Sequence, residues 1–206
     1  MDDPLRLAEL LTARLCHDLS GLLGGLQGTL DLMLEEAGDD DATAIAHETA
    51  TTLTQRLRLL RAAWSGATDP LDLSQLTALA HGLANRHVTL DTSALPPRTL
   101  FGPAMGRLLV NVLVLGADSL PRGGIVALDG DATDIIVRLS GPDADWPAGF
   151  AAMLVDEPTA WAALRDARGV EAPLTALLAH HGALCLTLLH ATGPATAAPP
   201  LRLTQT

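Results

Sequence analysis

The sequence predicts an α+β protein in which an antiparallel helical hairpin, residues 1–66, precedes an α/β sandwich, residues 69–206. Apolar residues recur every three or four positions across the first 64 residues, which is typical of long amphipathic helices. Shorter apolar segments separated by Gly, Pro and Asp follow, which is typical of strands mixed with short helices. With 48% hydrophobic residues, a chain of 206 residues can bury the core of one or two domains.

The first helix is expected from Leu5 to Glu36, where Pro4 suits a first helical turn. Gly38 can cap its end, and an Asp can begin a second helix that runs from Ala42 to about Trp64. Two helices of this length bury only the surface between them and leave many leucines in water. We therefore expect two chains to form a dimeric four-helix bundle.

The second part of the chain is expected to combine helices with a mostly antiparallel sheet. The pattern predicts helices at 73–85, 101–120 and 173–181, and strands at 87–91, 125–129, 134–139, 183–190 and 201–204.

Charge and composition exclude several classes of function. A formal net charge of −11 argues against nucleic acid and against an anionic membrane surface. The least polar window, Leu19–Leu34, is too short to span a bilayer and is interrupted by Gln27 and Asp31. The first residues lack the basic start and apolar run of a signal peptide, so we expect a cytoplasmic protein.

His17 and Asp18 are the most informative residues, because a histidine beside a carboxylate suits phosphoryl relay through an imidazole. On a helix, Gly21, Gly24 and Gly28 share the face of His17. Three glycines inside a helix cost ~3 kcal/mol relative to alanine, so a requirement for access or packing is expected. Either a partner protein approaches the imidazole there, or two helices of the bundle pack closely.

Arginines are expected near the histidine. If the hairpin turns at residue 39 or 40, His17 lies level with residue ~62 of the second helix, near Arg58 and Arg61, with Arg14 opposite. Guanidinium groups suit a transient phosphoryl group or an acidic partner, although each arginine could equally belong to a solvated helix face. The partner-binding set is expected to be Arg14, Ser20, Gly21, Leu22, Gly24, Arg58 and Arg61.

Other common site motifs do not occur. The histidines and the two cysteines lack metal-ligand spacing, so no metal site is predicted. The sequence contains no P-loop, no Gly-x-Gly-x-x-Gly and no Gly-x-Ser-x-Gly.

Three segments resemble boxes of histidine kinases. Arg14-Leu-Cys-His17-Asp18-Leu resembles the phosphoacceptor box of their dimerisation domain. The segment 111–124 resembles the asparagine box of their ATP-binding domain, and the segment 135–142 resembles the glycine box that follows. Leu115 stands where the asparagine box holds Mg²⁺, and Leu139 stands where the glycine box binds adenine through an aspartate. The resemblance therefore implies a degenerate ATPase-like sandwich that binds no nucleotide.

A kinase-like chain without a nucleotide site is similar to the ChpT-type histidine phosphotransferases of alphaproteobacteria. The resemblance implies a homodimer that takes phosphate from the receiver domain of a hybrid histidine kinase onto His17 and passes it to response regulators. It also implies that the chain needs no cofactor, because the Mg²⁺ ion is bound by the receiver domain. Gly21, four residues after His17, leaves phosphatase activity open. An active histidine kinase and a non-catalytic dimeric docking protein stay as alternatives.

Overall fold

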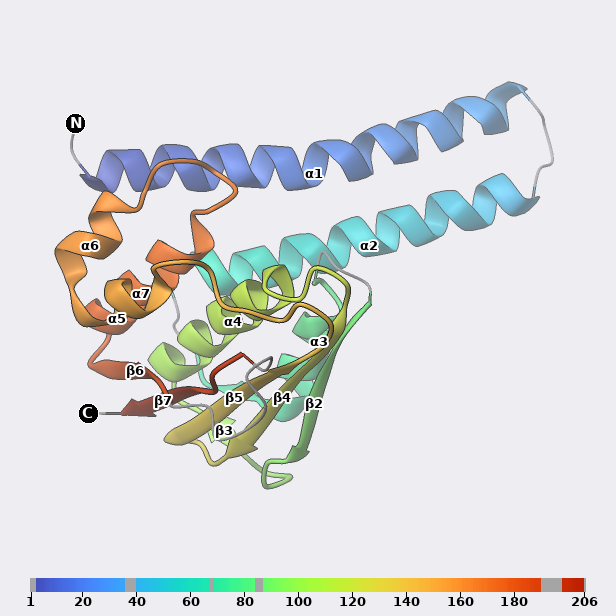
Figure 1. Ribbon diagram of the computed structural model, residues 1–206. Coiled ribbons are helices and arrows are strands. Elements are labelled where there is room, and N and C mark those ends of the chain that lie inside the picture. The colour runs from blue at the N-terminus through green and yellow to red at the C-terminus, as the bar shows by residue number, and fades with distance from the viewer. Residues whose placement is uncertain (1–2, 36–39, 67–68, 84–86, 190–197, 206) are drawn as a thin grey trace.

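Two long antiparallel helices lie along one side of the molecule, above a layer of helices and a sheet (Figure 1). The computed structural model describes residues 3–35, 40–66, 69–83, 87–189 and 198–205. Helix α1 spans Asp3–Glu35 and α2 spans Asp40–Trp64. None of the helices described is long and apolar enough to cross a membrane.

The hairpin turns earlier in the chain than the sequence predicts. Because α1 ends at Glu35 and α2 begins at Asp40, the turn is centred about two residues before the expected point, and each α1 residue faces a residue about four positions earlier in α2. His17 is therefore not level with position 62. Its neighbour Asp18 pairs with Arg56 instead.

The rest of the chain forms the expected mixture of helices and a mostly antiparallel sheet. Its helices are α3 (Leu73–Ala80), α4 (Pro103–Asp118), α5 (Phe150–Val155), α6 (Glu157–Ala162) and α7 (Glu171–His181). Its strands are β1 (Leu71–Asp72), β2 (Val88–Ala94), β3 (Leu100–Phe101), β4 (Gly124–Gly130), β5 (Asp134–Ser140), β6 (Leu184–Leu188) and β7 (Leu201–Gln205). The main sheet has the order β2-β4-β5-β7-β6, in which only the β2–β4 pair is parallel.

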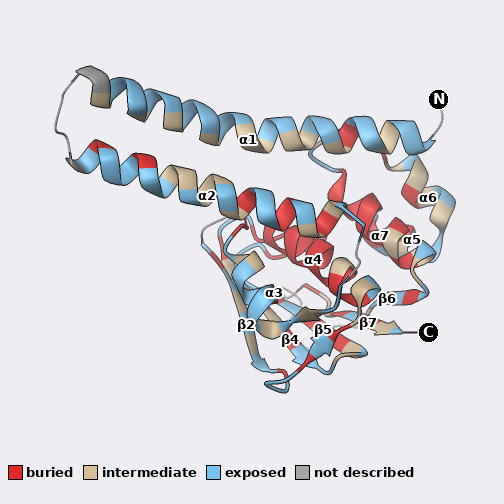
Figure 2. Cartoon of the chain, turned by 180° about the vertical axis from the view of Figure 1, so that it is seen from behind, coloured by how far each residue is buried: buried red, intermediate tan, exposed pale blue. Residues whose placement is uncertain are grey.

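The α+β class is confirmed, and apart from the position of the hairpin turn the differences concern short elements. The sequence pattern predicts neither α5 and α6, with six residues each, nor β1 and β3, with two each. Segments of this length complete too few periods for a pattern to be recognised. The helix expected at 101–120 is α4, which is buried along most of its length because it lies between the sheet and the hairpin (Figure 2).

A continuous core joins the hairpin to the sandwich. Leu59 and Ala63 of α2 are fully buried and belong to the same apolar cluster as α4. Buried Asn111 of α4 donates its side-chain amide to the carbonyl of Ala63, at 2.8 Å, and Arg107 donates its Nε to that carbonyl at 3.1 Å. The far end of the hairpin is largely exposed (Figure 2). The sandwich therefore holds the hairpin over the half that carries His17.

Candidate functional site

His17 projects from the middle of α1 into solvent, while the next side chain points inward. The His17 side chain is 64% exposed and that of Asp18 only 9%. Successive helical residues are about 100° apart, so Asp18 can face α2 while His17 faces outward. Their side chains still meet, because His17 Nδ1 lies 3.4 Å from Asp18 Oδ1. The structure thus brings the expected pair together.

Two arginines hold the Asp18 carboxylate. Arg14, one turn earlier in α1, places its Nε 3.0 Å from Oδ1 and 3.1 Å from Oδ2. Arg56 of α2 donates from Nη2 to Oδ2 and from Nη1 to the carbonyl of Gly82, at 3.3 Å. Burial disfavours the charged carboxyl, but the hydrogen bonds and charges of Arg56 and Arg14 outweigh it and lower the pKa of Asp18. Asp18 is therefore an anion under physiological conditions.

Arg14 also ties α1 to the sandwich. Its Nη2 lies 3.1 Å from Asp118 Oδ2 at the end of α4, and its Nη1 donates to the Arg168 carbonyl at 2.9 Å. Only 12% of the Arg14 side chain is exposed. Its donors are directed at protein groups rather than at the open side of His17.

Glu171 is a buried acid beside this network. It begins α7, and its Oε2 accepts from Trp64 Nε1 at 3.4 Å, while its Oε1 has no hydrogen-bond partner among the described residues. Burial, assisted by the negative charge of Asp118, raises the pKa of Glu171 to about 8. The side chain is therefore neutral at pH 7.

Replacing Glu171 with glutamine is expected to stabilise the protein at pH 8.5 and to leave it nearly unchanged at about pH 4, below the ordinary pKa of the carboxyl. The folded protein keeps the Glu171 proton up to about pH 8, whereas the unfolded chain releases it near the ordinary pKa, so stability falls as pH rises between the two values. Glutamine removes this dependence, and urea unfolding at both pH values measures it.

Glu157→Gln is the matched control. Glu157 also accepts from a tryptophan, Trp161 Nε1 at 3.0 Å, but that hydrogen bond is the main cause that lowers its pKa. This variant should gain nothing at pH 8.5. Equal behaviour of the two variants would contradict the assignment of Glu171 as a neutral buried acid.

The other residues expected at the site fall into two groups. Arg58 and Arg61 of α2 are exposed, and within the described part of the chain their side chains form no ion pair. Gly21 and Gly24 are exposed on the His17 face, and a Cβ at either would meet nothing within 4 Å.

Ser20 and Leu22 lie beside this face rather than on it. The Ser20 hydroxyl donates back to the Cys16 carbonyl at 2.6 Å. Leu22 is half-buried one turn after Asp18, on the side that faces α2.

The residue that the sequence analysis missed is Arg56. It is two positions from Arg58 in the sequence, but it faces α1 while Arg58 faces solvent. Only the correct helix ends, at Glu35 and Asp40, bring Arg56 level with Asp18. The carboxyl groups of Asp118 and Glu171 carry no local sequence signal, since only the tertiary fold brings them near Arg14.

The residues of the kinase-like boxes do not fit a magnesium nucleotide. Leu115 and Leu139 are buried, and a Cβ at Gly116 would lie only 3.2 Å from Leu139. Asn111 is fully buried, with its amide bound to Ala63 and Arg107 carbonyls and its oxygen enclosed without a partner. Across the residues that the structure describes, no three His, Cys, Asp or Glu side chains gather as metal ligands.

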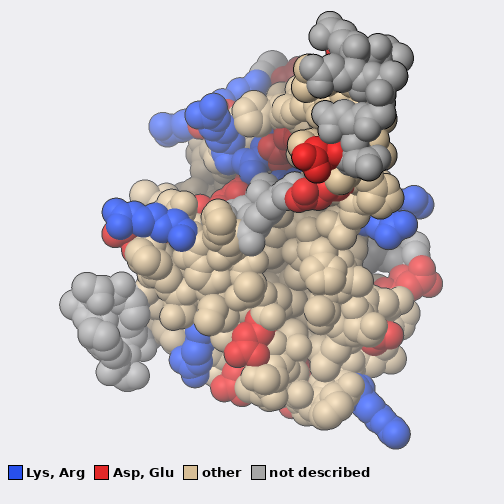
Figure 3. Space-filling model, turned by 90° about the vertical axis from the view of Figure 1, so that its right-hand side faces the viewer, with Lys and Arg blue, Asp and Glu red and all other residues tan. Residues whose placement is uncertain are grey.

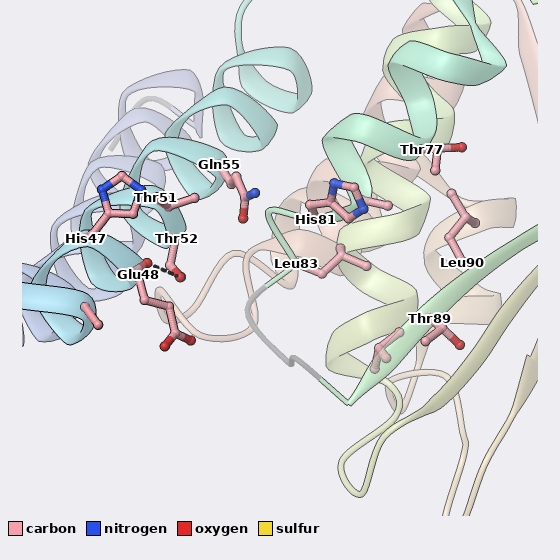
Figure 4. A pocket seen from close by; sticks show the side chains of 13 residues that line it. His47, Glu48, Thr51, Thr52, Gln55, Thr77, His81, Leu83, Thr89 and Leu90 are labelled. Atoms are coloured by element: carbon pink, nitrogen blue, oxygen red, sulfur yellow. Dashed lines mark hydrogen bonds between the residues drawn. The ribbon is translucent and has the colours of Figure 1, made fainter. Parts of the chain in front are cut away.

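A cleft of about 920 Å³ separates α2 from α3 and the start of β2. Figure 4 shows His47, Glu48 and Gln55 on the α2 wall, with His81 and Leu90 on the opposite side. The cleft lies closer to the hairpin turn than Arg56 and does not include His17.

On the face shown in Figure 3, the visible basic side chains of the described residues are scattered rather than aligned in a stripe.

Comparison with known proteins agrees with this arrangement. Residues 73–193 match the family model of the histidine phosphotransferase C-terminal domain. The chain is 29% identical over 199 residues to protein phosphotransferase ChpT of Brucella abortus (strain 2308), covering 91% of each. It is similar to a 1.7 Å structure of a bacterial phosphotransferase, with a TM-score of 0.72 and 26% identity over 97% of this chain and 95% of that one. The chain therefore belongs to the histidine phosphotransferase family.

Proposed function

We propose that this phosphotransferase acts in a two-component phosphorelay with His17 as the carrier. His17 takes the phosphoryl group from an aspartyl phosphate on the receiver domain of a hybrid histidine kinase and passes it to the aspartates of response regulators. The observation that carries the proposal is an exposed imidazole in contact with a buried carboxylate that two arginines keep anionic.

We propose a role for each imidazole nitrogen, supported by the contact between His17 and Asp18. An ionised carboxylate only accepts hydrogen bonds, so Nδ1, which faces Asp18, carries the proton. Nε2 then has the free lone pair and attacks phosphorus in line, while the bond from phosphorus to the receiver's aspartate breaks and that carboxylate leaves. Asp18 stabilises the cationic ring that results. Return of the phosphoryl group to a regulator follows the reverse path.

Positioning and charge neutralisation supply the catalysis in this proposal. The receiver brings its own Mg²⁺, and the chain supplies no cofactor. The proposal divides the chain into a dimerisation and phosphotransfer hairpin, residues 1–66, and a degenerate ATPase-like sandwich, residues 69–206. It places the protein in the cytoplasm, together with its signalling partners.

The experiment is a transfer assay with mapping of the label. The protein is incubated with a receiver domain that its hybrid kinase has phosphorylated from radiolabelled ATP, and the labelled residue is identified. We expect an acid-labile, base-stable phosphate on His17. No label would favour a docking protein, and label acquired from ATP and Mg²⁺ without a receiver would revive the kinase alternative.

The glycine face is proposed as the receiver docking surface, so filling it should block transfer. The Gly21→Leu, Gly24→Leu variant is expected to transfer at least about tenfold more slowly, because leucines would occupy the space that a receiver helix needs. The fold should be retained, since leucine is a better helix former than glycine by up to about 0.8–1.0 kcal/mol. Stopped-time transfer assays measure the effect.

Gly25→Leu is the control for this test. Gly25 is exposed on the same stretch of α1 with nothing within 4 Å, but it lies about 80° around the helix from His17, against about 40° or less for Gly21 and Gly24. If both variants transfer equally well, the glycine face is not the docking surface. A loss of dimer mass in the double variant would instead assign the face to packing between chains.

The homodimer is proposed to form through apolar side chains on another face of α1. Leu23 and Leu30 are 51% and 45% exposed and seven residues apart, so they share a face. Leu23 is about 120° around the helix from His17, which leaves the imidazole outside the dimer surface. The Leu23→Glu, Leu30→Glu variant is expected to be monomeric in light scattering, whereas exposed Leu100→Glu stays dimeric. A dimeric double variant would refute this face.

A further inference from the structure

We propose that Arg56 is a positioning residue for phosphoryl transfer, because it holds the Asp18 carboxylate in the orientation that His17 requires. The inference rests on the proposed role of His17 as the phosphate carrier.

The two oxygens of Asp18 have different partners. Arg56 Nη2 donates to Oδ2, whereas His17 Nδ1 lies 3.4 Å from Oδ1. Arg14 Nε lies between the two oxygens and does not by itself select an orientation. Holding Oδ2 fixes the rotation of the carboxylate, and that rotation decides whether Oδ1 meets the imidazole.

Arg56 is itself fixed from the sandwich. Its Nη1 donates to the carbonyl of Gly82, just after α3, at 3.3 Å. A Cβ at Gly82 would collide with the carbonyl of Gln55 and lie 2.8 Å from Leu59 Cβ. Glycine therefore allows the end of α3 to approach α2 closely enough to bind Arg56. Through this contact the sandwich, which contributes no nucleotide chemistry, helps to order the reactive pair.

Burial excludes a direct role for Arg56 in the reaction. Only 4% of its side chain is exposed, so it reaches neither a phosphoryl group on the outer nitrogen of His17 nor a docked partner. It acts through Asp18. Arg56 donates hydrogen bonds in two directions, to Asp18 and to Gly82. This arrangement suits arginine better than lysine, because the guanidinium presents several N–H groups in a fixed plane, whereas lysine presents a single point charge.

The test compares Arg56→Met with Arg107→Met. Arg107 is the matched control, since it is part-buried at the same interface and donates to the carbonyls of Ala63 and Trp64, away from Asp18. Arg56→Met is expected to slow transfer to and from His17 by about 10- to 100-fold, and Arg107→Met is expected to leave the rate near wild type. Arg56→Lys should recover part of the loss.

A second readout separates positioning from stability. The ¹⁵N chemical shifts of the imidazole report which nitrogen of His17 carries the proton in the neutral ring. Wild type and Arg107→Met should show the Nδ1–H form, whereas Arg56→Met should lose this preference. A residue that only stabilises the fold would not change the tautomer in a folded variant.

Each outcome decides the proposal. Equal transfer rates and equal tautomers in the Arg56→Met and Arg107→Met variants overturn it. If Arg56→Met does not fold, the Arg56→Lys variant is used in its place. A transfer rate of Arg56→Lys equal to that of Arg107→Met would also overturn the proposal. Label on a residue other than His17 in wild type refutes the proposed function instead, and the tautomer still tests the Arg56–Asp18–His17 geometry.

Discussion

The His17→Ala variant is expected to lose phosphoryl transfer and to keep its fold. Removing the attacking nitrogen leaves no group on α1 to form the phosphohistidine, so transfer from a phosphorylated receiver to a regulator should fall by at least about 1000-fold. Because the His17 side chain is 64% exposed, its removal should change the free energy of unfolding by less than about 0.5 kcal/mol. Labelled transfer assays and thermal unfolding measure the two effects.

His47→Ala is the appropriate control for this prediction. His47 is an exposed histidine on α2 that lines the cleft toward α3. It is expected to transfer at the wild-type rate, which would show that the loss is specific to His17 rather than to histidines on the hairpin. A His17→Ala protein that still relays phosphate at the wild-type rate would mean that another residue is the carrier.

Local patterns in the sequence predicted most of the fold, because the elements concerned are long or strictly alternating. The leucines of α1 and α2 complete many helical turns, and the β4–β5 hairpin alternates around a two-residue Gly-Asp signal. The proposed phosphotransfer pair His17–Asp18 is also local, since the two residues are adjacent on one helix. These features need no knowledge of how distant segments pack.

The partner of Asp18 could not be predicted in the same way. Which arginine reaches Asp18 depends on where the hairpin turns, and a shift of two residues at the turn displaces α2 by about 6 Å relative to α1. Because of this displacement, the part of α2 beside Asp18 is the one around Arg56 rather than the one around Arg61. The environments of Asp118 and Glu171 depend on contacts more than 100 residues apart, of which Arg14–Asp118 is an example at 104 residues.

In the segment that resembles the asparagine box, Asn111 and Leu115 serve packing in this structure. Asn111 begins the segment that resembles the asparagine box, and its amide joins α4 to the carbonyl of Ala63 in α2. Leu115, one turn later, continues the buried face of α4. In this structure α4 therefore supports the hairpin through its contacts with α2.

Replacing Asp18 with leucine is expected to impair both stability and transfer. The Asp18 and Arg56 side chains are 9% and 4% exposed, and removing one partner of a buried ion pair costs about 3–5 kcal/mol, because the other charge stays buried and unpaired. Transfer should also slow, since His17 loses the acceptor of its Nδ1 proton. Asp31→Leu, at an exposed position of α1, is the control and should change neither property.

The pH dependence of this loss follows from the lowered pKa of Asp18. A carboxyl whose pKa is lower in the folded protein stabilises it above the ordinary pKa and stops doing so as pH falls through the folded value. The stability difference between wild type and Asp18→Leu should therefore be constant above about pH 5 and should shrink in stronger acid. Urea unfolding across this range measures it.

The double variant Asp18→Leu, Arg56→Met separates the two roles of the ion pair. Replacing both buried charges with apolar side chains is often neutral for stability, so most of the stability lost in Asp18→Leu should return. Transfer should not return, because the apolar pair cannot hold the Nδ1 proton of His17. Recovery of both properties would reduce Asp18 to a structural residue. Recovery of stability alone would show that this chain retains a buried charge pair for the chemistry of the exposed histidine beside it.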